Sequence, residues 1–352
     1  MTAQPASKLH LTGLLGSGFS FVTRSLFTQT ELPFLLVFNN KEEAAYYLND
    51  MEQLVGEKDV LFYPASFRRP YQIEETDNAN VLLRAEVLNR INSRKKPAVI
   101  VTYPEALFEK VVTRKELDKN TLKVAVNDKI SIDFINEVLF EYEFKRVDFI
   151  TEPGEFSVRG GIVDVFSFSN DNPYRIEFFG NEVESIRTFD VATQLSIETK
   201  KKITIIPNVE NSFFQENRES FLDYISPQTV IFIQNTELLL ADLDKHFGKA
   251  EEAFAKLSQE IKRATPEQLF LNQASFVKRA LDFSVVEWGS KAVFKTLKTF
   301  PFHFQPQPSF NKQFDLLLNN LNENHFNGYK NYLFCSNDGQ VKRFHDIFES
   351  LD

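Results

Sequence analysis

The sequence predicts an α/β protein with a parallel sheet in its first region and an antiparallel α+β domain in its middle. Three features indicate this fold class. Short apolar runs alternate with amphipathic helical segments over residues 1–120, strand patterns dominate residues 121–207, and helical patterns with intervening strands return after that. We therefore expect domain boundaries near residues 120 and 207.

Three apolar runs in the first region predict buried strands, namely FLLVF (34–38), DVLFYP (59–64) and PAVIVTY (97–103). Between them, residues 41–54 and 78–91 repeat apolar side chains with helical spacing. Compact strands that alternate with amphipathic helices are typical of a parallel sheet with helices on its faces.

A loop before the first helical segment, LTGLLGSGFS, nearly matches the phosphate-binding pattern G-x-x-x-x-G-K-[S/T]. Gly13, Gly18 and Ser20 occupy their places in this pattern. Gly16 adds a further glycine, and Phe19 stands where the pattern requires lysine. The loop therefore has the frame of a P-loop without its charge.

The missing lysine predicts loss of nucleotide chemistry. A P-loop lysine binds the β and γ phosphate oxygens, and losing such a charge pair removes roughly 4 kcal/mol of binding free energy. In addition, the strand candidates at 59–64, 97–103 and 229–234 do not end in an Asp or Glu placed to hold Mg²⁺. We therefore expect no catalytic residues and no cofactor, although chance explains the glycines of the loop more simply when they are taken alone.

The middle region predicts a sheet with one helix. The helix candidate SIDFINEVLFEYEF (131–144) is followed by the strand-like runs KRVDFI, EFSVRGGIVDVFSF, YRIEFFG, EVESIRTFD and SIETKKKITIIP, with turn signals between them. The pair Gly160-Gly161 predicts a bulge or a close backbone approach.

Alternation along two of these strands separates a core face from an outward face. Four apolar side chains share the core face: Phe156, Val158, Ile176 and Phe178. Arg159, Arg175 and Phe179 then point outward. An exposed aromatic ring between arginines is typical of a protein–protein hot spot. The pattern alone favours the simpler interpretation, a solvated polar face with one partly shielded phenylalanine.

The third region, residues 208–309, predicts a long helix at 236–261 and strands at 229–234 and 281–289. The proline-rich run PFHFQPQPSF (301–310) predicts a linker.

The last residues, 310–352, predict one helix–strand–helix unit. Its strand candidate is NYLFCS, which contains Cys335, and we expect this strand to be buried. Because one such unit cannot cover both faces of its strand, we expect it to be the start of a truncated further domain.

Composition narrows the possible functions. The net charge of −9 opposes nucleic-acid binding, and the 37 phenylalanines are best explained as core residues. One cysteine and five widely separated histidines predict neither a disulfide framework nor a metal site. No apolar run reaches membrane-spanning length and no leader is evident, so we expect a cytoplasmic protein.

The stretches EPGEFSVRGGIVDVF and YRIEFFGNEVESIRTFD resemble the second domain shared by the bacterial excision-repair protein UvrB and the transcription-repair coupling factors (Mfd). The loop GLLGSGFS resembles the decayed nucleotide site of the coupling factors, because UvrB keeps the lysine. The resemblance covers about residues 8–310. It implies a discontinuous UvrB-like first domain (1–120 and 208–309), interrupted by a UvrA-binding second domain (121–207) and followed by the start of a third.

The resemblance also implies a function. A module of this kind recruits UvrA to stalled RNA polymerase, and its contact residues would be Arg159, Arg175 and Phe179. The full-length parent would be an ATP-dependent DNA translocase that binds DNA and RNA polymerase and covers this face with its own C-terminal domain. We expect this chain to be a binding platform that is not an enzyme and does not bind DNA. The alternatives are a UvrB-like ATPase that binds damaged DNA, and a nucleotide sensor that does not hydrolyse.

Overall fold

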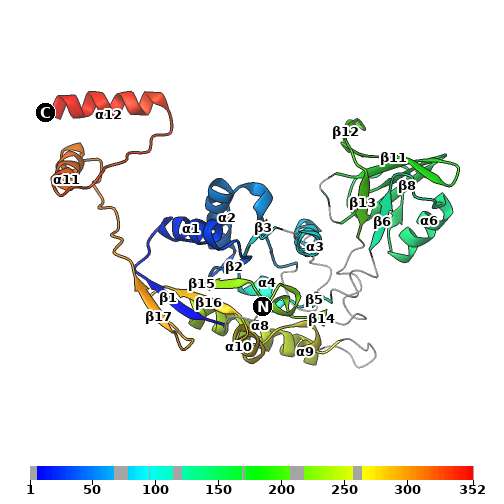
Figure 1. Cartoon of the computed structure of the whole chain (residues 1–352), viewed down its shortest axis with the longest axis horizontal. Helices are drawn as coiled ribbons and strands as arrows, with labels where there is room; N and C mark the ends of the chain where they lie inside the picture. The colour runs from blue at the N-terminus through cyan, green and yellow to red at the C-terminus, as the bar shows by residue number, and fades with distance from the viewer. Residues whose placement is uncertain are drawn as a thin grey trace. The chain divides into compact units, whose positions relative to one another are not determined.

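The computed structural model describes residues 6–66, 78–94, 96–113, 121–168, 170, 172–206, 218–256 and 264–351. The chain forms two compact units, Met1–His303 and Phe304–Asp352. The first unit contains two large sheets, and the second contains two helices (Figure 1). The boundaries that the sequence predicts near residues 120 and 207 fall in or beside 114–120 and 207–217, outside the described residues.

The larger sheet has seven strands in the order β17-β1-β16-β15-β2-β4-β3, and all its neighbours are parallel. Its strands are β1 Lys8–Thr12, β2 Phe34–Val37, β3 Val60–Phe62, β4 Val99–Thr102, β15 Val230–Ile233, β16 Ser284–Trp288 and β17 Lys298–Pro301. Four strands precede the middle region and three follow it, which confirms that one parallel sheet is interrupted by an insertion.

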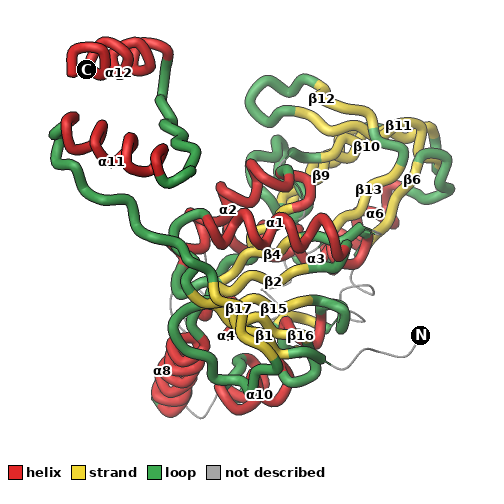
Figure 2. The backbone as a smooth tube through the Cα atoms, turned by 60° about the vertical axis from the view of Figure 1, so that its left-hand side comes forward, coloured by secondary structure: helices red, strands yellow, loops and turns green. Residues whose placement is uncertain are grey.

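Helices cover both faces of this sheet: α1 and α2 lie on one face, and α8 and α10 on the other (Figure 2). The helices are α1 Gly18–Thr30, α2 Lys41–Val55, α3 Asn78–Ser93, α4 Pro104–Phe108, α7 Phe221–Tyr224, α8 Thr236–Ala255, α9 Pro266–Leu269 and α10 Gln273–Ala280, with a 3₁₀ turn at Glu57–Asp59. Three of these helices begin at asparagine caps whose side chains accept a backbone hydrogen bond: Asn40 before α2, Asn235 before α8 and Asn272 before α10. A short pair of strands, β5 Val111–Val112 and β14 Arg218–Glu219, adds to this domain.

The inserted region forms a six-stranded sheet in the order β12-β11-β10-β9-β8-β7, which is antiparallel except for the β7–β8 pair. Its elements are β6 Leu122–Ala125, α6 Ile132–Glu141, β7 Lys145–Arg146, β8 Glu155–Arg159, β9 Ile162–Val165, β10 Tyr174–Phe179, β11 Glu182–Phe189, β12 Ser196–Thr199 and β13 Lys202–Ile205. The strands β6 and β13 pair with each other. Side chains of α6 and of one face of the sheet share a core.

The glycine pair of the inserted domain makes the turn between β8 and β9, where Arg159 is opposite Ile162. Gly160 has a φ of +60°, which favours glycine. A Cβ on Gly161 would lie 3.1 Å from the carbonyl oxygen of Phe178, so the predicted close backbone approach is present. The register shifts in this sheet lie elsewhere, between Glu177 and Phe178 of β10 and between Thr188 and Phe189 of β11.

The second unit consists of α11 Phe314–Phe326 and α12 Asp338–Leu351. The rings of Phe314 and Phe344 are 6.0 Å apart and join the two helices. The prediction of a buried strand at Cys335 is wrong: residues 327–337 contain no strand, and Cys335 is partly exposed. A strand needs a neighbour to receive its hydrogen bonds, and the described part of this unit has none. Among the described helices, none has the length and apolarity to cross a membrane.

Candidate protein-interaction surface and the degenerate nucleotide loop

One face of the inserted sheet carries charged side chains, and we call this the open face. The core face of the same strands is apolar, since Phe156, Ile176 and Phe178 are buried there as the alternation predicts. On the open face, the pairing register places Asp164 of β9 opposite Arg175 of β10.

Asp164 connects the two predicted arginines. Its side chain is 1% exposed. Its Oδ1 accepts a hydrogen bond from Arg175 Nε at 2.7 Å, and its Oδ2 accepts one from Arg175 Nη2 at 2.8 Å. Oδ2 also accepts from Nη2 of Arg159. One buried carboxylate therefore orients both guanidinium groups, and the hydrogen bonds that it accepts raise the pKa of Arg175 above its usual range.

Arg175 is held from several sides. Its guanidinium lies 4.3 Å from the ring centre of Phe189, and its Nη2 donates to Oε1 of Gln194 at 3.1 Å. Phe189 belongs to a small buried cluster with Ile150 and Phe166. The Arg175 side chain is consequently only 15% exposed, so it points to the predicted face but is largely part of the structure.

Arg159 and Phe179 are more accessible. The Arg159 side chain is 40% exposed and stacks on the ring of Phe149, with 5.1 Å between the guanidinium carbon and the ring centre. Phe149 is itself 65% exposed. Phe179 ends β10 and is 80% exposed, on the same side of the strand as Arg175 by alternation. The three residues predicted from the sequence thus lie on one face.

The charges of the open face nearly balance. Arg187 pairs with Glu177, whose other oxygen accepts a hydrogen bond from the Ser185 hydroxyl at 2.6 Å. Together with Asp164 and its two arginines, this gives three guanidinium groups against two ion-paired carboxylates. The register places Glu182 opposite Phe179, which adds an exposed carboxylate to the same face. A partner carboxylate would therefore be attracted by the accessible Arg159 rather than by a net positive charge of the face.

The phosphate-loop positions serve packing. Phe19 is 1% exposed and stacks on Trp288 with ring centres 3.8 Å apart. Three further rings contact its edges or faces: Phe38, Tyr47 and Phe232. Ser20 follows it, and its hydroxyl donates to Oδ2 of Asp50 at 2.8 Å. The side chains at the lysine and serine positions of the pattern, Phe19 and Ser20, therefore both make contacts within the protein.

A neighbouring backbone also approaches the loop. Phe302 follows β17, and its amide donates to the carbonyl of Thr12 at 2.8 Å. A Cβ on Gly13 would lie 2.0 Å from the Phe302 carbonyl oxygen, and Gly13 has a φ of +74°. The Phe302 backbone therefore leaves no room for a side chain at Gly13. Gly16 also has a positive φ, of +51°, and Gly18 begins α1.

A strand-end carboxylate that the sequence search missed is Glu287 of β16. It is 1% exposed. Its Oε1 accepts from the Thr236 hydroxyl at 2.6 Å and from the amide of Val293 at 2.8 Å, and its Oε2 accepts from the amide of Phe294 at 3.0 Å. Glu287 therefore connects β16 to the start of α8 and to the loop that follows β16. Nowhere in the described residues do three or more His, Cys, Asp or Glu side chains gather as metal ligands would.

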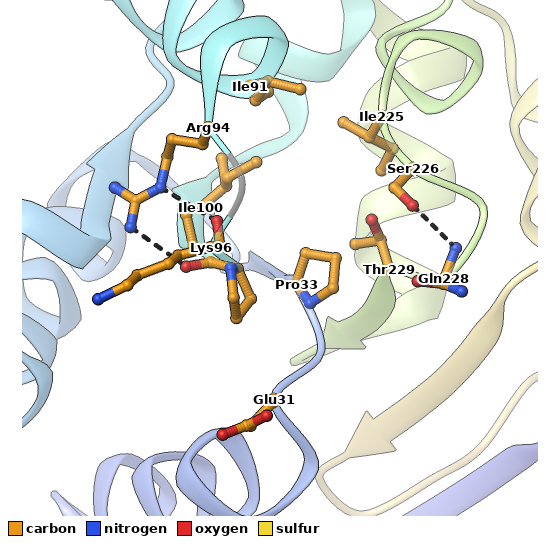
Figure 3. A pocket seen from close by; sticks show the side chains of 12 residues that line it. Glu31, Pro33, Ile91, Arg94, Lys96, Ile100, Ile225, Ser226, Gln228 and Thr229 are labelled. Carbon is orange, nitrogen blue, oxygen red and sulfur yellow. Dashed lines mark hydrogen bonds between the residues drawn. The ribbon is translucent and has the colours of Figure 1, made fainter.

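A pocket of about 260 Å³ lies at the amino-terminal ends of three strands of the parallel sheet, beside Pro33, Ala98 and Thr229, which precede β2, β4 and β15 (Figure 3). Arg94, one of its polar side chains, hydrogen-bonds to the backbone of the adjacent loop: it donates to the carbonyl oxygens of Lys96 at 3.2 Å and Pro97 at 3.3 Å. The described side chains that line it include no acid–base pair in contact, so the open face is the stronger functional candidate.

The inserted domain belongs to a known class of protein domain, because residues 122–210 match the UvrB interaction domain. The chain is 34% identical over 201 residues to the transcription-repair-coupling factor of Bacillus subtilis (strain 168), covering 57% of this chain and 17% of that protein. It is 29% identical over 204 residues to that of Rickettsia bellii (strain RML369-C), covering 58% of this chain and 18% of the relative. It is 28% identical over 217 residues to that of Myxococcus xanthus, covering 60% and 18%.

This chain is thus homologous to the N-terminal region of transcription-repair-coupling factors, and it carries a UvrB interaction domain. The resemblance expected from the two strand motifs is confirmed. The matches span less than a fifth of the length of these relatives.

Proposed function

We propose that this chain is a docking module of transcription-coupled repair that binds UvrA through the open face of its inserted domain. The observation that carries the proposal is the arrangement of Arg159, Arg175 and Phe179 on one face of the matched domain, with Phe179 80% exposed. Large aromatic and arginine side chains dominate the binding free energy of protein interfaces. In this proposal Phe179 fills an apolar pocket of UvrA, and the part of the open face that carries the arginines meets acidic residues of UvrA.

We also propose that the chain is not itself an enzyme. The burial of Phe19 against Trp288 and the approach of Phe302 to Gly13 support this proposal, because an apolar ring replaces the lysine that would bind phosphate and a neighbouring backbone crowds the loop. The same contacts disfavour the two alternatives, a UvrB-like ATPase and a nucleotide sensor. Within a longer protein of the coupling-factor type, which would be an ATP-dependent DNA translocase, the module would bring UvrA to stalled RNA polymerase.

The test is calorimetric titration of the chain with UvrA from the same organism. Phe179→Ala should weaken binding by about 2 kcal/mol or more, as expected for an aromatic anchor. The matched control is Phe134→Ala on α6, which removes an exposed ring (45%) from the helix that packs on the core face of the sheet. Unchanged binding by Phe179→Ala, or no binding by the folded unmodified chain, would count against the proposal.

A further inference from the structure

Asp164 holds the two arginines of the open face in different ways. We infer that Asp164 is a positioning residue that fixes Arg175 in the framework and leaves Arg159, backed by Phe149, as the arginine that binds a partner carboxylate. This inference rests on the proposed function, because it assigns separate tasks to residues of the same surface. It also adds Phe149 to that surface.

Arg175 has little capacity left for a partner. Its Nε and Nη2 donate to the two oxygens of Asp164, and Nη2 also donates to Gln194. This bidentate contact uses one edge of the planar guanidinium, and the ring of Phe189 covers one of its faces. If Arg175 turned toward a partner, it would leave the Asp164 carboxylate, which is 1% exposed, short of two hydrogen bonds.

Arg159 is free to exchange its contacts. It is bound to Asp164 by Nη2 alone, and no other polar group among the described residues accepts from its guanidinium. Moving Arg159 would leave Asp164 with both hydrogen bonds from Arg175. Its exposed side chain can therefore turn to an incoming carboxylate at small cost.

Phe149 supports the guanidinium of Arg159 with its ring. Its exposed ring lies beneath the Arg159 guanidinium, and a partner side chain that closes over the ring would exclude water from the charge. Excluding water strengthens an ion pair because it lowers the local dielectric constant. The site therefore suits an acidic residue flanked by apolar side chains.

The sheet register brings Arg159 near the exposed end of β10. Arg159 is opposite Ile162, and Ile162 is opposite Glu177. Two strand spacings place Arg159 about 10 Å from Glu177, and Phe179 lies two residues further along β10. One partner surface can therefore contact Phe149, Arg159 and Phe179 together.

The first experiment compares affinities of the full chain for UvrA by calorimetry. Phe149→Ala and Arg159→Ala should each lower the affinity roughly tenfold or more with little change in the urea midpoint. The controls are Phe134→Ala and Arg90→Ala, where Arg90 makes a partly exposed i,i+4 ion pair with Glu86 on α3. Wild-type affinity in either Phe149→Ala or Arg159→Ala would overturn the inference.

The second experiment separates the roles of the two arginines. Arg175→Ala should lower the urea midpoint, because it leaves the buried Asp164 carboxylate short of two hydrogen bonds, whereas Arg159→Ala should leave the midpoint nearly unchanged. A midpoint lowered equally by both variants, or by Arg159→Ala alone, would overturn the assignment.

A third measurement needs no partner. The Nε–H NMR signal of Arg175 should exchange slowly in the unmodified chain and rapidly in Asp164→Asn. Rapid exchange in both proteins would overturn the framework role of Arg175. Failure of the unmodified chain to bind UvrA would instead count against the proposed function, and this signal would still decide whether Asp164 fixes Arg175.

Discussion

Replacing Phe19 with lysine restores the residue that the phosphate-binding pattern lacks, and we predict that it destabilises the protein without creating a nucleotide site. The Phe19 ring is 1% exposed, stacks on Trp288 and contacts three more rings. Removing a buried phenylalanine costs about 3–5 kcal/mol, and each aromatic pair adds about 0.5–1.5 kcal/mol beyond its buried area. We therefore expect Phe19→Ala to lower the free energy of unfolding by about 4 kcal/mol. Phe19→Lys should cost at least as much, because its ammonium must leave the aromatic cluster or be buried in it.

The chain provides its own probe for this measurement. Trp288 is its only tryptophan and lies in direct contact with Phe19, so its fluorescence in a urea titration reports on the parallel-sheet domain. Phe21→Ala is the matched control, since this residue lies on the same helix but is 61% exposed, and its effect should stay within about 0.5 kcal/mol. A loss below about 1 kcal/mol for Phe19→Ala would refute the packing role. Micromolar ATP binding by Phe19→Lys would refute the conclusion that the site is blocked.

Three further predictions concern the same domain. Gly13→Ala should lower the free energy of unfolding in urea by more than about 1 kcal/mol, because Gly13 has a positive φ and its added Cβ would meet the Phe302 carbonyl. The control Gly248→Ala should stabilise the protein slightly, because Gly248 lies in α8 and its added Cβ has open space. Glu287→Ala should cost about 3 kcal/mol by the same measurement, because the Thr236 hydroxyl and two backbone amides lose their acceptor; a loss under 1 kcal/mol would contradict this. Burial lowers the pKa of Lys8 below 10.5, so the unfolded chain binds more protons between the lowered value and 10.5, and stability should rise with pH through that window. Urea midpoints measured against pH should lose this slope in Lys8→Met, and an unchanged slope would exclude Lys8 as its source.

The sequence was sufficient for those features that depend on local pattern. The buried strands of the parallel sheet appeared as short apolar runs because helices cover both of their faces. Alternation along β8 and β10 placed Arg159, Arg175 and Phe179 on the outward face, since a strand reverses side at every residue. The predicted linker also agrees with the irregular backbone that follows Pro301.

Features that depend on pairing between distant segments could not be predicted from local sequence pattern. The role of Asp164 requires the register of β9 against β10, which strand alternation does not give. A signal was present, because an aspartate in the apolar run IVDVF needs a buried partner. The predicted strand at Cys335 failed for the converse reason: its apolar composition suits a strand, but the described part of its unit offers no strand to pair with it.

The order of strands in the larger sheet has a consequence for synthesis on the ribosome. The first strand, β1, pairs with β16 and β17. Lys8 therefore cannot pair until Val285 of β16 has been synthesised. At roughly 5–20 residues per second, this wait lasts on the order of 15–55 seconds. All strands of the inserted domain emerge within this interval, and its first and last strands, β6 and β13, are hydrogen-bonded neighbours. The inserted domain with its open face can therefore fold while the parallel sheet is still incomplete. The remaining strands of that sheet then assemble beside the two adjacent ends of a folded domain.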